Sequence, residues 1–247
     1  MRSILTALAA VIFLIIGIPL LGIEWLIGKV SPHARDISSL RLVQGIFKIM
    51  LFLSGVKLTV IGEENVPKDQ TVLYVLNHRS YYDIFIVYSR CPGLTGFIAK
   101  KGIGKIPLVK PWMDRLYCLL LDHDDKRASM RTILTAIDHC KNGISIAVCP
   151  EGTRCRSDDD TELLPFHEGT FKIATKSGVP VVPVTMNHTS AIFEEHMPWV
   201  HGTHVVLEYG KPVMISDLSP EDQKFPGEYF RGIMTEMLKK NEDLPAK

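Results

Sequence analysis

The sequence predicts an α/β fold: a mixed, partly parallel sheet flanked by helices, with an N-terminal membrane-embedded helical segment. Three observations support this prediction. An uncharged apolar stretch occupies residues 3–23. Beyond residue 57, short apolar runs typical of buried strands alternate with segments of helical periodicity. Glycine, proline and asparagine separate these segments, which favours strand–helix–strand units over an all-α or all-β domain.

The apolar stretch at 3–23 is long enough to cross a bilayer. Its 21 residues rise roughly 30 Å as a helix, which matches the thickness of the hydrocarbon core. A signal peptide has a shorter apolar core followed by small residues, whereas Glu24 and Trp25 follow here. More basic residues lie beyond the stretch than before it: Lys29, Arg35 and Arg41 against Arg2. This bias predicts a cell-membrane protein whose large domain faces the cytoplasm.

A second apolar stretch at 42–60 has helical spacing but is interrupted by polar residues. The apolar residues that set the spacing are Val43, Ile46, Phe47, Met50 and Leu51. Such a helix lies in the membrane interface beside the first segment, or it covers the core of the domain; we favour the interface. The sequence therefore predicts a membrane anchor with an interfacial helix over 1–56 and an α/β domain over 57–247.

Strands and helices alternate through the predicted α/β domain. Strands are expected at 57–62, 71–76, 96–99, 116–121, 144–149, 179–184 and 203–209. Helices are expected at 82–88, 126–141, 168–177 and 228–240. The runs at 71–76 and 144–149 are the kind found in strands buried on both faces. The acidic segment 157–160 is interpreted as a solvated loop tip.

Charge and cysteine content argue against several classes of protein. Residues 1–60 carry six Lys/Arg against two Asp/Glu, and the rest of the chain carries 22 against 25. A basic membrane-proximal segment joined to a mildly acidic domain does not indicate a nucleic-acid partner. Five cysteines without a C-x-x-C pair argue against a zinc cluster or a disulfide framework, so no metal site is predicted.

The first chemically distinctive segment directly follows the apolar run at 71–76. It reads Asn-His-Arg-Ser-Tyr-Tyr-Asp over 77–83. Ligands of open α/β sheets bind beside the carboxyl ends of strands, so His78 is expected to project into a crevice there. Neutral imidazole accepts a proton near pH 7, and Asp83 orients the ring if a helix begins after residue 80. Because no G-x-S-x-G context is present, His78 is expected to activate a substrate hydroxyl directly.

A second distinctive segment, Pro-Glu-Gly-Thr-Arg, follows the apolar run at 144–149. Gly152 allows close approach of the backbone to a ligand, and Thr153 and Arg154 offer donors to phosphate oxygens. Glu151 either pairs with Arg154 or holds a substrate hydroxyl. Further basic residues form a solvated face or bind the phosphate of a lipid headgroup or an anionic acyl carrier: Lys100, Lys101, Lys105, Lys110 and Arg115.

Together these residues resemble the glycerolipid acyltransferases. Segment 77–83 resembles the NHxxxxD box of that family and 149–154 resembles its FPEGTR box. Segment 97–101 resembles the block between these boxes, and 179–184 resembles the later block that carries prolines. Order and spacing agree over residues 57–212. The short chain, single catalytic domain and apolar N-terminus look most like the bacterial 1-acyl-sn-glycerol-3-phosphate acyltransferases.

The resemblance implies transfer of a fatty acyl group from acyl-CoA or acyl-carrier protein to the 2-hydroxyl of lysophosphatidic acid. The product is phosphatidic acid, the partner surface is the lipid bilayer, and no cofactor is needed beyond the acyl donor. His78 is then the general base and Asp83 its partner. The glycerol-phosphate site is formed by Glu151, Gly152, Thr153 and Arg154, with Lys100 or Lys101 as possible additions.

Three departures from the family pattern stand near these boxes. His123 replaces a usual arginine, His167 replaces a common lysine, and Cys149 replaces an aromatic residue. The first two leave the acceptor open, so glycerol-3-phosphate or another lysophospholipid is the alternative. A metal-dependent lipid hydrolase that uses the same His–Asp pair with the acidic run 158–160 is the candidate from a different class.

Overall fold

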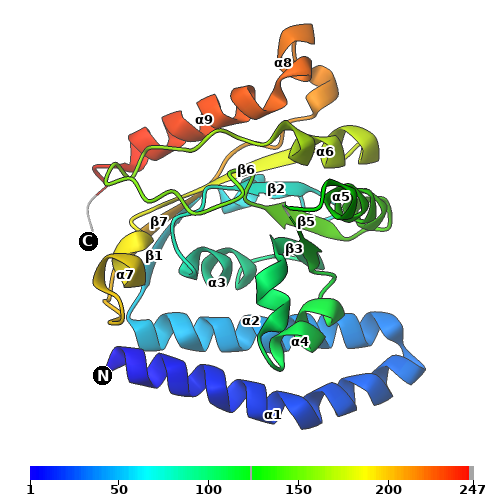
Figure 1. Ribbon diagram of the computed structural model, residues 1–247, viewed down its shortest axis with the longest axis vertical. Helices are drawn as coiled ribbons and strands as arrows, with labels where there is room; N and C mark the ends of the chain where they lie inside the picture. Colours follow the sequence, from blue (N-terminus) through cyan, green and yellow to red (C-terminus); the bar gives the residue numbers. More distant parts are fainter. Residues whose placement is uncertain (123, 245–247) are drawn as a thin grey trace.

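The computed structural model of the chain describes residues 1–122 and 124–244. Helices α1 (Arg2–Val30) and α2 (Pro32–Ser54) form an antiparallel hairpin. The hairpin lies along one side of a sheet that is covered by helices on both faces (Figure 1). The predicted mixed α/β architecture is confirmed.

Seven strands form the sheet within the described residues, in the order β1-β7-β6-β2-β5-β3-β4. Their bounds are β1 Lys57–Ile61, β2 Leu73–Leu76, β3 Thr95–Lys100, β4 Leu119–Leu121, β5 Ser145–Val148, β6 Val181–Asn187 and β7 His204–Tyr209. All neighbouring strands are parallel except β6 and β7. The carboxyl ends of β2, β5 and β3 therefore meet at one edge of the sheet, and β1 runs in the opposite direction to β2.

Two apolar clusters lie on the two faces of the sheet. Successive residues of β2 alternate between them, as the two-residue period of a strand requires: Leu73 and Val75 in one, Tyr74 and Leu76 in the other. The helices beyond the hairpin are α3 Tyr82–Tyr88, α4 Val109–Arg115, α5 Lys126–Lys141, α6 Lys172–Ser177, α7 Ser190–Phe193, α8 Pro220–Lys224 and α9 Pro226–Asn241. The first cluster packs under α5, α6 and α9, and the second packs against α2, α3 and α4.

The clearest sequence signals gave the most accurate boundaries. Helix α5 coincides with the predicted helix at 126–141, because Asp125 caps its start by accepting the N–H groups of Arg127 and Ala128. Helices α4, α7 and α8 were not predicted.

The strand predicted at 116–121 is shorter in the structure, where β4 begins at Leu119. Leu116 instead closes α4 through its N–H bond to the Trp112 carbonyl. The chain then turns at Tyr117, whose φ of 59° lies in the left-handed region.

The two helices of the hairpin have different surroundings. Both are long and apolar enough to cross a membrane by length and composition. Most of α1 is exposed, whereas the inner face of α2 is buried against the core through residues such as Leu40 and Val43. Of the two interpretations of the second apolar stretch, coverage of the core is therefore observed. The outer face of α2 leaves Ile49 and Phe52 exposed.

Candidate active site

The first motif forms a turn between β2 and α3 that brings Asp83 back to His78. Nδ1 of His78 lies 2.8 Å from Oδ2 of Asp83. The same oxygen accepts the backbone N–H groups of Arg79 and Ser80, each at 2.8 Å. Asp83 is only 1% exposed and occupies the first turn of α3, where the helix dipole favours a negative charge. The carboxylate therefore fixes both the ring of His78 and the backbone that carries it.

These contacts determine which nitrogen of His78 is available. A carboxylate oxygen can only accept a hydrogen bond, so Nδ1 of the His78 ring carries the hydrogen that it donates to Oδ2 of Asp83. Nε2 of the neutral ring then keeps its lone pair. The side chain of His78 is 21% exposed, so the ring is reachable from outside. The arrangement suits removal of a proton from a bound hydroxyl.

The second motif follows β5 as a tight turn. The N–H of Gly152 donates to the Cys149 carbonyl at 3.1 Å, and Gly152 has a φ of 69°, which favours glycine. Glu151 is 4% exposed, and its two oxygens accept the N–H groups of His78 and Leu164, each at 2.9 Å. Of the alternatives open from the sequence, pairing of Glu151 with Arg154 is wrong, because both carboxylate oxygens face backbone donors.

Backbone hydrogen bonds join the two motifs at His78. Its N–H donates to Glu151 at 2.9 Å, and its carbonyl accepts the N–H of Cys155 at 2.8 Å. The two motifs, about seventy residues apart in the chain, thus meet at the carboxyl edge of adjacent parallel strands β2 and β5. Asn77 fixes the other side of this edge, since its amide exchanges two hydrogen bonds with the backbone of Met186 in β6.

Burial of Glu151 makes a testable contribution to stability. Desolvation raises the pKa of Glu151, and the N–H groups of Leu164 and His78 offset part of this rise. The folded protein then holds this proton more tightly than the unfolded chain does. The free energy of unfolding should fall as pH rises from the ordinary pKa of glutamate, about 4.3, through the raised value in the fold.

We expect Glu151→Gln to remove this part of the pH dependence. Urea unfolding of both proteins from about pH 4 to pH 7 measures it. As pH rises, the free energy of unfolding of the wild type should fall relative to that of Glu151→Gln. A difference that stays constant over this interval would contradict the assignment.

Arg154 is held at the surface of the site by two residues. Its Nη1 donates to Glu194 at 2.8 Å, and its guanidinium carbon lies 3.9 Å from the centre of the Tyr81 ring. Glu194 also accepts the N–H of Tyr81 at 2.9 Å. No sequence pattern pointed to Glu194, because it lies 40 residues from Arg154 in a short helical turn. Arg154 is 20% exposed and presents a cation beside the first motif.

The other candidate residues for phosphate binding occupy the same edge or its rim. Thr153 is exposed in the turn next to Arg154. Lys100 ends β3, one strand beyond β5, so it reaches the carboxyl edge that carries His78. Lys101 is more peripheral: its side chain is 65% exposed, and its ammonium pairs with Asp122 at 2.8 Å. The substituted position His123 lies outside the described residues.

The acidic segment 157–160 is not simply a solvated loop tip. Arg79 of the first motif is 4% exposed, and its Nε lies 3.0 Å from Asp160. Asp160 also accepts the N–H of His188 at 2.7 Å. A buried guanidinium needs an anion, so the loop is fastened over the motif at Asp160. Among the described residues, no three or more His, Cys, Asp or Glu side chains are grouped to hold a metal ion.

The thiol that directly precedes the second motif, that of Cys149, is not activated. The pKa of Cys149 is raised well above its ordinary value, first by burial and then by the negative charges of Asp83 and Glu151. A thiol that keeps its proton at neutral pH is a poor nucleophile. Cys149 is therefore not suited to form a covalent thioester with an acyl group.

A family model described as Acyltransferase matches residues 57–187, which hold both motifs. The chain belongs to this family. This acyltransferase is 30% identical to the 1-acyl-sn-glycerol-3-phosphate acyltransferase of Borreliella burgdorferi over 185 residues, which cover 74% of the chain and 72% of the relative. It is 28% identical to the Saccharomyces cerevisiae enzyme of that name over the whole chain and 79% of the relative.

A solved structure agrees over the full length of this acyltransferase. The crystal structure of the 1-acyl-sn-glycerophosphate acyltransferase PlsC from Thermotoga maritima matches with a TM-score of 0.85 and 25% identity. The match covers 100% of this chain and 97% of the other. The sequence resemblance to glycerolipid acyltransferases is therefore confirmed, and with it the assignment as an enzyme.

Proposed function

We propose that this acyltransferase moves a fatty acyl group from acyl-CoA or acyl-carrier protein to the sn-2 hydroxyl of lysophosphatidic acid, which yields phosphatidic acid. The observation that supports the reaction best is the ring of His78, oriented by Asp83 in a motif whose Tyr81 also packs against the Arg154 guanidinium. The names of the relatives support lysophosphatidic acid as the acceptor.

The proposed reaction proceeds in one complex of both substrates. Nε2 of His78 takes the proton from the acceptor hydroxyl as its oxygen attacks the carbonyl carbon of the thioester. The carbon–sulfur bond then breaks, and the imidazolium returns its proton to the departing thiolate. Asp83 stabilises the imidazolium in between. Base catalysis of this kind contributes about 10²–10⁴-fold, and alignment of the two substrates contributes further. No cofactor or metal takes part.

Arg154 is proposed to bind the acceptor phosphate. The phosphate either replaces Glu194 as the partner of the guanidinium or binds while Arg154 stays paired with Glu194. Hydrogen bonds to a charged group contribute about 1.5–3 kcal/mol. We expect Arg154→Gln to raise KM for lysophosphatidic acid about 10- to 100-fold with a much smaller change in kcat. Arg156→Gln is the matched control, since Arg156 is exposed two positions on and carries the same charge. Equal KM values in the two variants would contradict the assignment.

We further propose that the hairpin attaches the protein to the cell membrane, with the catalytic domain on the cytoplasmic side. The apolar exposed surface of α1 supports this: Ile4, Leu8, Ile12, Ile15, Ile16, Ile23, Trp25 and Leu26. Both halves of α1 are also tied to the rest of the chain. Ser3 accepts the N–H of Val200 at 2.8 Å, and Glu24 accepts the hydroxyl of Ser38 at 2.7 Å.

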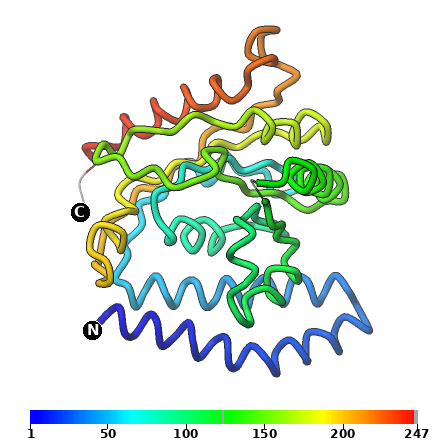
Figure 2. Tube along the Cα trace, in the orientation of Figure 1, coloured from blue at the N-terminus to red at the C-terminus, as the bar shows by residue number. Residues whose placement is uncertain are grey.

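The place where α1 starts indicates how deeply the hairpin enters the bilayer. Figure 2 shows this start at the open end of the hairpin, near the segment that contains Val200, and α2 lies between α1 and the sheet. A helix that lies along α2 and is tied to the domain at its start is suited to lie in one leaflet, where a lysophospholipid acceptor is also found. This placement favours lysophosphatidic acid over the soluble alternative, glycerol-3-phosphate.

The test is acyl transfer from labelled oleoyl-CoA and from palmitoyl-acyl-carrier protein, with each acceptor offered separately. We expect labelled phosphatidic acid from lysophosphatidic acid, little product from glycerol-3-phosphate, and no loss of activity with a chelator. Transfer to glycerol-3-phosphate alone would establish the alternative acceptor. Donor-independent release of phosphate or fatty acid that a chelator abolishes would establish a metal-dependent hydrolase.

A further inference from the structure

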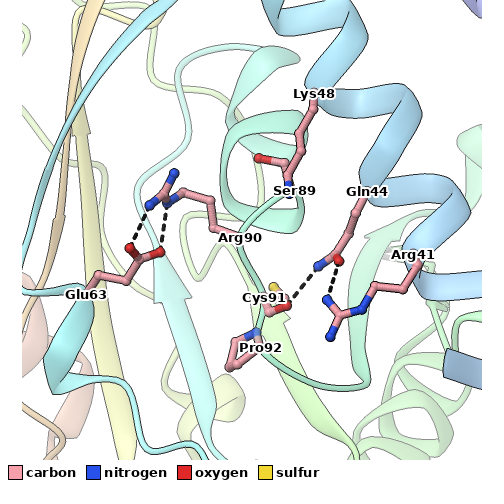
Figure 3. Close-up of a pocket in the computed structure, with 8 residues that line it drawn as sticks. All are labelled: Arg41, Gln44, Lys48, Glu63, Ser89, Arg90, Cys91 and Pro92. Carbon is pink, nitrogen blue, oxygen red and sulfur yellow. Dashed lines mark hydrogen bonds and ion pairs between the residues drawn. The ribbon is translucent and has the colours of Figure 1, made fainter.

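A second cationic site lies away from the catalytic motifs. Because β1 runs opposite to β2, Glu63, which follows β1, lies near the amino end of β2, whereas His78 follows its carboxyl end. A pocket of about 270 Å³ opens there between α2 and the end of α3. Figure 3 shows Arg41 and Lys48 on either side of Gln44, all three extending from α2 toward the segment after α3. We call this the α2–α3 pocket.

The charges that line the α2–α3 pocket do not balance. Arg90 is neutralised by Glu63, which accepts from its Nε at 2.8 Å and from its Nη2 at 2.6 Å. Arg41 donates to the neutral amide oxygen of Gln44 at 2.7 Å. Across the described residues, neither Arg41 nor Lys48 has an acidic partner. Two positive charges are therefore available to an anion.

The wall between these two cations is fixed. Gln44 is 3% exposed, and its amide nitrogen donates to the carbonyls of Tyr88 and Cys91 at 3.1 and 2.8 Å. These bonds hold α2 against the end of α3. The pocket is thus a formed feature of the fold and not a chance gathering of mobile side chains.

The outer face of α2 indicates the kind of anion. Arg41 and Lys48 are seven residues apart, so they share a face of the helix about two turns apart. Toward the outside of the helix, Phe52 lies one turn after Lys48 and is 82% exposed, and Ile49 on the adjoining side is 51% exposed. Basic residues interleaved with exposed apolar residues are typical of a helix at the surface of an anionic membrane. The volume suits a headgroup, since pockets that enclose whole small ligands usually begin at about 300 Å³.

We propose that the α2–α3 pocket binds the phosphate of an anionic phospholipid headgroup, whose acyl chains stay in the bilayer beside Ile49 and Phe52. The proposal rests on the proposed attachment of the hairpin to a membrane. It assigns a lipid contact distinct from the acceptor site at Arg154. An acidic acyl-carrier protein is the less favoured partner, because the exposed apolar residues have no role in it and His78 lies at the other edge of the sheet.

The bound lipid would hold the active site at the membrane surface. Helix α3 runs alongside α2: Tyr82 at its start contacts the Ser54 hydroxyl at 2.8 Å, and its far end contacts Gln44. Asp83 lies in the first turn of the same helix. A headgroup that binds α2 at the far end therefore fixes the position, relative to the membrane surface, of the helix that carries Asp83 in its first turn.

The test compares vesicle binding of wild type with an Arg41→Gln/Lys48→Gln double variant. The matched control is Lys172→Gln/Lys176→Gln, which removes the same charge from exposed positions of α6 on the opposite face of the sheet. Neutral phosphatidylcholine vesicles report attachment by the hairpin, and vesicles with added phosphatidylglycerol report the anionic contribution. We expect the first variant to lose about 10- to 30-fold of the affinity for anionic vesicles and none for neutral ones, with the control like wild type.

Several results would overturn the proposal. Equal losses in the variant and the control would mean diffuse attraction without a site. Unchanged vesicle binding would also overturn it, whether the variant loses affinity for soluble acyl-carrier protein, for inorganic phosphate, or for neither. Acyl transfer to lysophosphatidic acid in detergent micelles checks the proposed function separately, because it depends on His78 and not on vesicles.

Discussion

Replacing His78 with alanine is expected to lower kcat for acyl transfer by about 10²–10⁴-fold and to leave the fold intact. The proposed proton acceptor is lost, and the neighbouring carboxylates of Asp83 and Glu151 accept backbone N–H groups. The structural cost is small, because Asp83 keeps the N–H groups of Arg79 and Ser80 as donors. Steady-state kinetics with lysophosphatidic acid and oleoyl-CoA measure the loss, and thermal unfolding checks the fold.

His33→Ala is the control for this experiment, since His33 is exposed at the start of α2 and lies outside both motifs. It should retain the activity of the wild type. A His78→Ala protein with more than about a tenth of wild-type kcat would fall outside the range of base catalysis and would rule out His78 as the base.

The pairing of His78 with Asp83 was predictable because it is local. An apolar run that ends in polar residues marks the end of a strand, and a helix that begins within five residues must fold back over it. The meeting of the two motifs was predictable for a related reason. Both follow strands buried on both faces, and such strands in a parallel sheet place their carboxyl ends at one edge.

The roles of Glu151, Asp160 and Glu194 were not predictable from the pattern. Each carboxylate has several possible partners in sequence, and tertiary packing decides among them. Glu151 is buried by the turn, so it binds backbone donors and leaves Arg154 to Glu194. Asp160 is recruited because Arg79 is buried. A charged segment is predicted to be a solvated surface unless it is known that a residue of opposite charge is buried beside it.

Helix α2 shows a similar limit at the level of the fold. Its sequence fits both an interfacial helix and a core helix, because it carries apolar residues on more than one face. Leu40 and Val43 are buried against the domain, and Ile49 and Phe52 are exposed. The packing of α1, α3 and α4 against it separates these faces.

Asp83→Asn is expected to lower kcat nearly as far as His78→Ala, by about 10²–10⁴-fold. Oδ2 of Asp83 accepts from His78, Arg79 and Ser80 together. An asparagine oxygen in that place keeps the geometry but cannot offset the charge of the imidazolium. If the amide turns its NH₂ group toward His78, the ring must present a bare Nδ1 and carry its hydrogen on Nε2, which removes the base.

The double variant His78→Ala/Asp83→Asn separates this role from a purely structural one. When two residues act as one unit, replacing the second after the first causes little further loss of kcat. The double variant should therefore be close to His78→Ala in kcat. Independent losses would multiply instead. Asp138→Asn, at an exposed position on α5, is the control for the charge change and should leave kcat unaltered. A multiplicative loss would mean that Asp83 supports the site through the backbone of α3 and not through the ring of His78.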